Sequence, residues 1–205
     1  MMEAVGWKFE RKASEKGYRR IAGIDEAGRG PLAGPVVAAA VILPYAAAPD
    51  GLNDSKKLSP KRRERLYDAI YSQALGVGIG IVDATFIDRI NILQAALTAM
   101  VLAVHNLHPG SDFLLIDGNA AIPLGIPQKA IVRGDSRSAS IAAASIVAKV
   151  TRDRLMQHYH LYYPEFDFPR HKGYPTRLHR NALRENGCCP IHRMSFSGVK
   201  QCRNC

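Results

Sequence analysis

The apolar positions fall into short runs that are typical of strands. Arg20–Asp25 and Pro35–Leu43 are two such runs joined by a glycine-rich loop, which predicts an antiparallel pair. Gly76–Val82 alternates glycine with β-branched residues, and Phe113–Asp117 and Lys129–Val132 are short and apolar. These three segments predict three further strands.

Helical spacing appears between and after the strands. Ser59 and Pro60 suit the N-cap and first position of one helix. Asp83–His105 is long, periodic and rich in alanine and leucine, and Ser136–Tyr159 has the same character. Together the elements predict an α/β protein with a five-stranded mixed sheet flanked by helices, in a domain over residues 18–162.

The rest of the chain, residues 163–205, is basic and predicted to be mostly helical. Tyr163–Pro169 is rich in proline and aromatic residues and is predicted to be a hinge loop. From Arg170 to Cys205 there are eight Lys or Arg residues and one acid, in a chain of net charge +10. Such a block predicts contact with a polyanion, either nucleic acid or an anionic membrane surface. A solvated tail is the alternative, which the interleaved Tyr174 and Phe196 disfavour.

Composition predicts one core and a cytoplasmic location. The 205 residues are 47% hydrophobic, and the N-terminus has no apolar run of signal-peptide length. The longest apolar stretches are strand-sized, so we expect no membrane contact. All four cysteines lie late, and their spacing is typical neither of a disulfide framework nor of paired C-x-x-C zinc ligands, so we expect free thiols: Cys188, Cys189, Cys202 and Cys205. A zinc site from the last two cysteines with His192 or Cys188 is an alternative.

Acidic residues close several of the predicted strands. Asp25 and Glu26 end the first strand, Asp117 ends the fourth, and Asp135 precedes the last long helix. A buried acidic pair is costly, and a bound divalent cation is a common way to offset that cost. Because ligand sites collect at strand ends, we expect the four carboxylates to meet around Mg²⁺ or Mn²⁺, which prefer oxygen donors. Such a site suits two-metal phosphoryl transfer.

Each acid also has a structural alternative. Asp135 can cap the helix that follows it, and Asp117 can begin a turn with Gly118. Neighbours on a strand point to opposite faces, so Asp25 and Glu26 reach one cluster only if the strand ends or twists between them. The glycines that follow make such a bend easy.

Several segments, in order along the chain, resemble the motifs of ribonuclease HII. They are Ile24–Val36, Leu52–Ser59, Ile116–Gly118, Gly134–Ser136, Ser140–Asp153, His171–Tyr174 and His192–Phe196. The resemblance runs from Tyr18 to Val199. It implies a ribonuclease H-like fold and an endonuclease that hydrolyses the RNA strand of RNA–DNA hybrids. It also implies incision 5′ of single ribonucleotides in duplex DNA, as in ribonucleotide repair, leaving 5′-phosphate and 3′-hydroxyl ends.

The resemblance assigns roles to ten residues. The ligands of Mn²⁺ or Mg²⁺ would be Asp25, Glu26, Asp117 and Asp135. The substrate-binding residues would be Gly28, Arg29, Gly30, Lys56, Lys57 and Tyr174. The glycine loop would read the ribose 2′-hydroxyl, the tyrosine would stack beside it, and the lysines would hold backbone phosphates.

Some expectations rest on features of related proteins that this chain does not share. It stops soon after Phe196, which predicts no peptide for a sliding clamp, and the cysteines belong to no motif of the family. About 17 residues precede the first strand, too few for the extra N-terminal domain of ribonuclease HIII. We expect a monomer. The alternatives are a non-catalytic hybrid-binding protein and a metal-dependent DNA nuclease or transposase-type integrase of the same fold.

Overall fold

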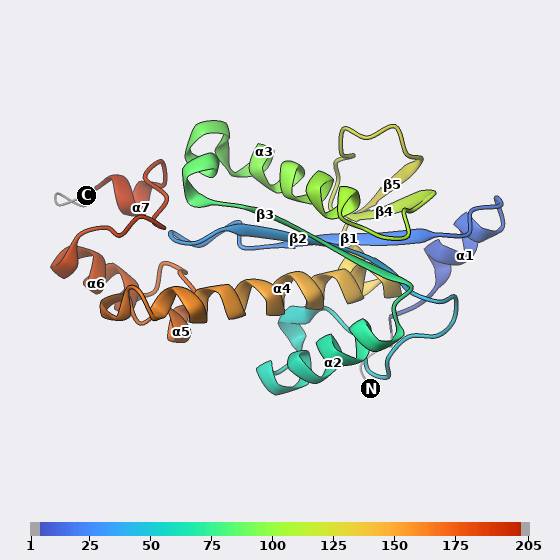
Figure 1. The fold of residues 1–205 in the computed structure, drawn as a ribbon, viewed down its shortest axis with the longest axis horizontal. Coiled ribbons are helices and arrows are strands. Elements are labelled where there is room, and N and C mark those ends of the chain that lie inside the picture. Colours follow the sequence, from blue (N-terminus) through green and yellow to red (C-terminus); the bar gives the residue numbers. More distant parts are fainter. Residues whose placement is uncertain (1–4, 202–205) are drawn as a thin grey trace.

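The computed structural model describes residues 5–201 and contains one sheet in the order β3-β2-β1-β4-β5 (Figure 1). The strands are β1 (Ile21–Ala27), β2 (Val36–Ile42), β3 (Gly76–Val82), β4 (Phe113–Asp117) and β5 (Gln128–Ile131). β1 pairs antiparallel with β2 and β2 with β3, whereas β4 runs parallel to β1 and to β5. The five-stranded mixed sheet predicted from the sequence is confirmed.

Helices cover both faces of this sheet. α3 (Ala84–His105) lies on one face, and α4 (Ala139–His160) lies on the other with α2 (Pro60–Gln73) outside it (Figure 1). The shorter helices are α1 (Lys8–Ser14), α5 (Phe168–His171), α6 (Arg177–Asn186) and α7 (Ser197–Lys200). Three 3₁₀ turns are η1 (Ser55–Lys57), η2 (Gly134–Ser136) and η3 (Pro164–Phe166).

Side-chain caps fix where the three long helices begin. Ser59 accepts a hydrogen bond from the Arg62 N–H at the start of α2, as predicted, and Asp83 does the same for α3. α4 begins at Ala139 and not at Ser136, because the preceding residues form η2 and Ser138 is the N-cap. The alternative that Asp135 caps this helix is therefore wrong.

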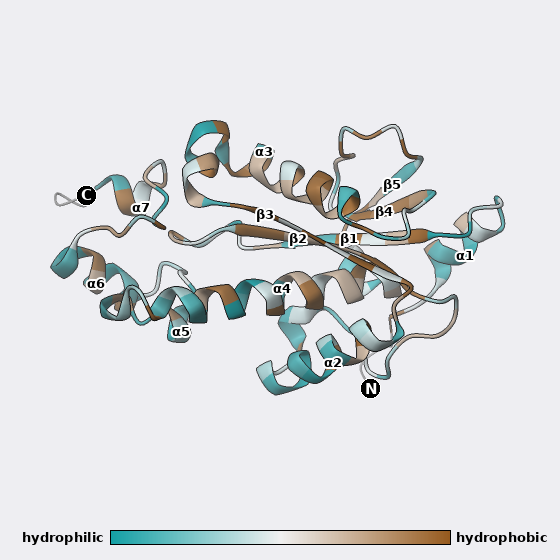
Figure 2. Cartoon of the chain, viewed as in Figure 1, coloured by the Kyte–Doolittle hydropathy of each residue, from teal (hydrophilic) through white to brown (hydrophobic). Residues whose placement is uncertain are grey.

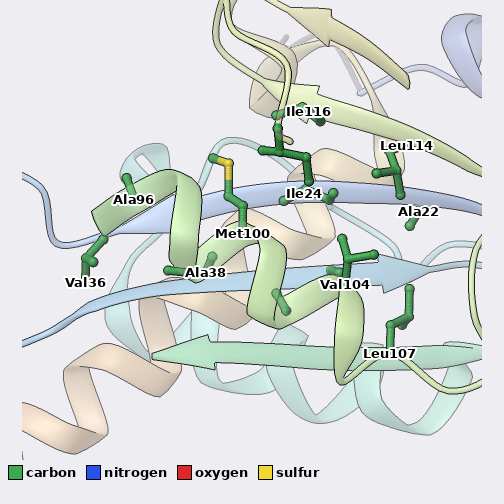
Figure 3. Packing of buried hydrophobic residues seen from close by; sticks show 14 of the residues in the cluster. Ala22, Ile24, Val36, Ala38, Ala96, Met100, Val104, Leu107, Leu114 and Ile116 are labelled. Carbon is green, nitrogen blue, oxygen red and sulfur yellow. The ribbon is translucent and has the colours of Figure 1, made fainter. Parts of the chain in front are cut away.

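The core lies in two layers, one on each face of the sheet. Beneath α3, Ile24 and Ile116 of adjacent strands pack against Met100 and Val104 (Figure 3). On the other face the alanine-rich half of α4 lies directly on β1, since a Cβ atom at Gly23 would come within 2.0 Å of the Ser140 carbonyl carbon. Hydrophobic colour follows the strands and the inner sides of both helices (Figure 2). α4 is thereby held against the strand that carries Asp25.

α3 is long and apolar enough to cross a membrane by length and composition, with a mean hydropathy of 1.5. This helix was predicted from the sequence, but its span-like length and apolar composition were not, because the longest apolar stretches were interpreted as strands. One such helix is weak evidence for a span, and α3 is interrupted at Asn91, whose φ is +69° and whose side chain caps the following turn. The straight part after Asn91 is about 20 Å long, shorter than the ~30 Å hydrocarbon core of a bilayer.

The segment predicted as a hinge loop instead contains η3 and α5. Phe166 and Phe168 are fully buried, and they pack with Met156 of α4 and with Leu32, which lies between β1 and β2. In Figure 1 the chain after α4 gathers around this β1–β2 connection. The C-terminal region therefore braces the glycine-rich loop. The division into two domains at residue 163 stays a prediction.

Candidate active site

Asp25 and Glu26 both lie inside β1, which continues to Ala27 without ending between them. Asp25 pairs with Ala39 in the layer beneath α4, whereas Glu26 pairs with Ala38 beneath α3. The two side chains therefore leave opposite faces of the strand. The Asp25 carboxylate turns back along the chain, where its Oδ1 accepts a 2.7 Å hydrogen bond from the Glu26 N–H.

Asp117 follows Ile116, which is paired in parallel with Ile24, so Asp117 and Asp25 are the next residues on neighbouring strands. Asp117 Oδ1 accepts a 2.6 Å hydrogen bond from the Gly134 N–H. This bond ties η2, which carries the buried Asp135, to the end of β4. The parallel register and one carboxylate therefore bring three acids from remote segments to the same end of the sheet.

The carboxylates at this end of the sheet repel one another. Burial raises the pKa of Asp25 well above its usual range, and the charges of Glu26 and Asp117 raise it further. A hydrogen bond from the Ser145 hydroxyl opposes that rise. Burial also raises the pKa of Asp135, and Asp117 contributes in the same direction. The negative charge here exceeds what the surrounding hydrogen bonds offset.

Lys56 lies at the edge of this acidic group. Its Nζ atom is 3.5 Å from Asp135 Oδ2, although 79% of its side chain is exposed. Burial lowers the pKa of Lys56, but Asp135, Asp25 and Asp54 outweigh that effect and raise it. Lys57 occupies the same 3₁₀ turn and is exposed.

Two contributors to this group were missed by sequence reasoning. Asp54 caps η1 by accepting the Lys56 N–H, and its charge acts on Asp135. Ser145 of α4 bonds both Asp25 and the Ser55 hydroxyl, the latter at 2.8 Å. Both residues lie within segments that resemble the family motifs. Asp54 lies just before the two lysines and Ser145 lies within the alanine-rich run, and these positions were the signal in the sequence.

Within residues 5–201 no three His, Cys, Asp or Glu side chains lie close enough to enclose a metal ion as they stand. The donor chemistry nevertheless fits a hard divalent cation, because the group consists of carboxylate oxygens. Burial first, and neighbouring carboxylates second, raise the pKa of Asp25 and Asp135, and a bound cation would offset both effects by favouring the charged carboxylates.

The glycine loop leaves the end of β1 and lies beside Tyr174. Gly28 has φ +101°, and a Cβ there would come within 2.2 Å of the Arg152 Nε atom, so only glycine fits. Arg29 turns back to Glu26, with 3.2 Å between Nη1 and Oε1. A Cβ on Gly30 would lie 3.7 Å from Tyr174 Cε1. The structure thus brings the predicted loop and the predicted tyrosine together.

Tyr174 is partly exposed while its backbone is fixed. The residue is 40% exposed, and its ring centre lies 5.9 Å from both the Lys149 ammonium and the Arg152 guanidinium. Its carbonyl oxygen accepts a 3.1 Å hydrogen bond from His179 Nδ1. His179 Nε2 in turn lies 2.9 Å from His192 Nε2, so a buried histidine pair supports the tyrosine from below.

The cysteines give a mixed outcome. Cys202 and Cys205 lie outside the described residues, and with them the proposed zinc site at the chain end. His192, which with Cys188 was one of the two candidates to join those cysteines, contacts His179 through Nε2 and accepts the Cys189 N–H through Nδ1. Cys189 is a free, buried thiol as expected, whereas the expectation is wrong for Cys188, which is disulfide-bonded.

The ribonuclease HII family model matches residues 22–199. The chain belongs to the ribonuclease HII family. Ribonuclease HII of Geobacter metallireducens is 57% identical over 195 residues, covering 95% of this chain and 92% of the relative. Ribonucleases HII are endonucleases, and this chain is accordingly a phosphodiester hydrolase that acts on RNA–DNA hybrids.

Solved structures agree with this assignment. The ribonuclease H2 of Pyrococcus horikoshii superposes with a TM-score of 0.74 at 25% identity, covering 89% of this chain and 96% of that one. A more distant likeness is Bst-RNase HIII in complex with Mn²⁺, at 19% identity and a TM-score of 0.69, covering 88% of this chain and 68% of that one. The fold of this ribonuclease HII is therefore the ribonuclease H-like fold expected from the sequence.

Proposed function

We propose that this ribonuclease HII incises 5′ of single ribonucleotides in duplex DNA as well as within hybrids, leaving 5′-phosphate and 3′-hydroxyl ends. The proposed ligands of the catalytic Mg²⁺ or Mn²⁺ are Asp25, Glu26, Asp117 and Asp135. The observation that carries the proposal is the parallel pairing of β1 and β4, which places Asp25 of β1 beside Asp117 at the end of β4, close to the glycine loop. The Mn²⁺ complex of the structurally related RNase HIII supports a divalent cation.

The chain prepares this end of the sheet for a cation and a phosphate. Bound cations would polarise the scissile phosphate and activate water. Asp25 is oriented by the Glu26 N–H and the Ser145 hydroxyl, and Asp117 holds η2 so that Asp135 faces the same region. These bonds fix the carboxylates before substrate arrives, which lowers the cost of ordering them during the reaction.

Recognition of the ribose is proposed for Gly28, Arg29, Gly30 and Tyr174. The 2′-hydroxyl alone distinguishes RNA from DNA at one nucleotide, and it lies in the minor groove, where backbone groups of a glycine loop can approach it. The Tyr174 ring offers a rigid surface against the sugar. We expect Tyr174→Ala to reduce cleavage at a single-ribonucleotide junction about tenfold or more, with little change in binding of plain duplex. Equal losses in both would assign the ring to packing.

Two grooves that carry basic side chains support a duplex-binding surface, and each includes a residue near Tyr174, Lys149 in one and Gly30 in the other. In one groove Arg63, Lys149, Arg170 and Lys172 outnumber two acids, Glu64 and Asp153, the latter paired with Lys149 at 2.6 Å. The other begins at Gly30 and Pro175 and includes Arg180 and Arg184 of α6. With Lys56 and Lys57, these side chains are proposed to contact phosphates, so that affinity falls as salt rises. Action as a monomer in the cytoplasm, in ribonucleotide repair, is part of the same proposal.

An incision assay tests the proposed chemistry. A labelled duplex with one ribonucleotide is incubated with Mg²⁺, Mn²⁺ or EDTA, beside an all-DNA duplex of the same sequence. We expect incision only with metal and only at the ribonucleotide, and loss on the order of 10³-fold in Asp25→Asn and Asp117→Asn. Asp68→Asn, the same change at an exposed position of α2, is the matched control and should cut as the parent does.

Each remaining outcome has a definite meaning. Parent-like cleavage by Asp25→Asn and Asp117→Asn would contradict the proposed metal ligands. Equal cutting of the all-DNA duplex would contradict ribose recognition and favour a DNA nuclease. Binding of hybrid without cleavage under any metal would favour the binding-protein alternative.

A further inference from the structure

Arg193 lies beneath the glycine loop, and its side chain is completely buried. Its guanidinium makes five hydrogen bonds of 2.6 to 3.1 Å, all to backbone carbonyl oxygens. The acceptors are Gly28, Arg29, Pro31 and Gly34. An arginine side chain has five N–H donors, so all the donors of Arg193 bind carbonyl oxygens of the loop.

The charge of Arg193 has no carboxylate partner in an ion pair within residues 5–201. Burial, with help from the neighbouring Arg152 charge, lowers the pKa of Arg193 to about 9, so it stays charged at neutral pH. Burying a cation against carbonyl dipoles alone is costly, and an apolar side chain of similar volume would avoid that cost. The planar fork of the guanidinium is what an apolar residue could not supply.

The inward carbonyls determine where the loop N–H groups point. In a planar trans peptide the C=O of one residue and the N–H of the next point in opposite directions. Because the Gly28 and Arg29 carbonyls face Arg193, the N–H groups of Arg29 and Gly30 face away from it. Neither N–H has a protein acceptor in the part of the chain that the structure describes. Two adjacent donors are thus presented beside Tyr174.

The segment that carries Arg193 is itself anchored. The Asp88 carboxylate of α3 accepts hydrogen bonds from the Met194 and Ser195 N–H groups at 2.8 and 2.9 Å. The Phe196 ring lies 5.1 Å from the guanidinium carbon. Arg193 is therefore a fixed support and not a mobile side chain that happens to meet the loop.

We propose that Arg193 is a specificity-determining positioning residue, which holds the Arg29 and Gly30 N–H groups outward so that they bind the ribose 2′-oxygen. This rests on the proposed reading of the ribose by the loop. Arg193 does not touch substrate, and its effect is on the orientation of the peptide groups that do.

Binding without cleavage tests the proposal. The dissociation constants for a single-ribonucleotide duplex and the matched all-DNA duplex are measured by fluorescence anisotropy in EDTA, and their ratio is the preference for ribose. In Arg193→Lys, which keeps the charge but loses the fork, we expect this preference to fall about tenfold, the loss of roughly one hydrogen bond. Affinity for all-DNA duplex should stay within about twofold, since phosphate contacts are unchanged.

Two further variants separate positioning from a general loss of stability. Leu183→Ala opens a cavity in the same C-terminal core without touching a loop carbonyl, so it should keep the preference. Asp88→Asn keeps the guanidinium but loosens its support, and should lose part of the preference even if Arg193→Lys does not fold.

The outcomes distinguish recognition of the ribose by the loop from the role of Arg193. A parent without any preference would contradict loop reading itself, and the role of Arg193 falls with it. A parent preference that Arg193→Lys and Asp88→Asn both retain would overturn only the role of Arg193. An equal loss in Leu183→Ala would also overturn it, because the effect would then follow stability.

Discussion

The two ends of the proposed active site are opposite in how they handle charge. At the acidic end, burial and neighbouring carboxylates raise the pKa of Asp25 and Asp135, and the ammonium that pairs with Asp135, that of Lys56, is mostly exposed. At the loop end, the buried guanidinium groups of Arg152 and Arg193 have no ion-pair partner among residues 5–201, yet carbonyl oxygens accept hydrogen bonds from both. The acidic end thus carries negative charge that the protein leaves partly unbalanced, and we call it incomplete. At the loop end the protein itself supplies the partners of the buried charges, and we call it complete.

This difference teaches how the two tasks are divided. A cation that arrives with substrate can complete the acidic end, so that catalysis is conditional on metal. The loop must distinguish one hydroxyl group, and therefore it is rigidly preorganised by the protein itself. Buried arginines suit that role because their charge is permanent, whereas the carboxylates gain a ligand only when a cation is present.

Metal binding should stabilise the protein through the acidic end. At a free Mn²⁺ concentration 100 times its dissociation constant, the free energy of unfolding should rise by about 2.7 kcal/mol. For a chain of this size that corresponds to roughly 5–10 °C in Tm, measured by calorimetry. Asp25→Asn should lose more than half of this shift without lowering Tm in EDTA, because it removes repulsion while its amide oxygen still accepts the Glu26 N–H.

Asp68→Asn is the control for this experiment, and it should show the full metal-induced shift. A Tm shift in Asp25→Asn equal to that of the parent would mean that the cation binds elsewhere. The acidic end would then not be the region that a cation completes.

The histidines beneath Tyr174 should give the loop end its own pH dependence. Burial is the main reason that the pKa values of His179 and His192 fall to about 4. In the unfolded chain they titrate near 6.5. Between pH 6.5 and about 4 the unfolded state therefore binds protons at these two histidines, whereas the native state does not. As the pH is lowered through this range, the free energy of unfolding should therefore decrease by about 1.4 kcal/mol per pH unit for each histidine.

Urea unfolding across this pH window measures the slope. His192→Asn, which retains an acceptor for the Cys189 N–H, should reduce it, whereas His158→Asn on the exposed side of α4 should leave it unchanged. Asp25 acts in the opposite sense: its folded pKa is raised, so protonation as pH falls relieves repulsion and favours the native state. An unaltered slope in His192→Asn would show that the buried histidines do not set it.

Sequence reasoning went furthest where local chemistry decides the structure. The strands, the Ser59 cap and Asp117 at the end of β4 follow from patterns within a few residues of each other, whereas Asp25 and Glu26, predicted to end the first strand, lie inside β1. The start of α4 was misplaced because the 3₁₀ turn η2 lies just before the helix, and the sequence pattern does not separate the two. Arg193 lies in the recognised His192–Phe196 motif, but its role was missed because it depends on carbonyl directions in a loop about 160 residues earlier, which no spacing rule encodes.

The smallest expected effect concerns Lys56, which stands between the two regions as either a phosphate ligand or a counter-ion for Asp135. If it contacts a phosphate, Lys56→Met should weaken duplex binding a few-fold and reduce the slope of log affinity against log salt by about 0.9. Its free energy of unfolding should change by less than about 0.5 kcal/mol, because the side chain is largely exposed. Lys57→Met in the same turn gives the comparison for a second predicted contact. An unchanged salt slope with a larger Mn²⁺-induced Tm shift in Lys56→Met would instead show that the ammonium competes with the cation at the acidic end.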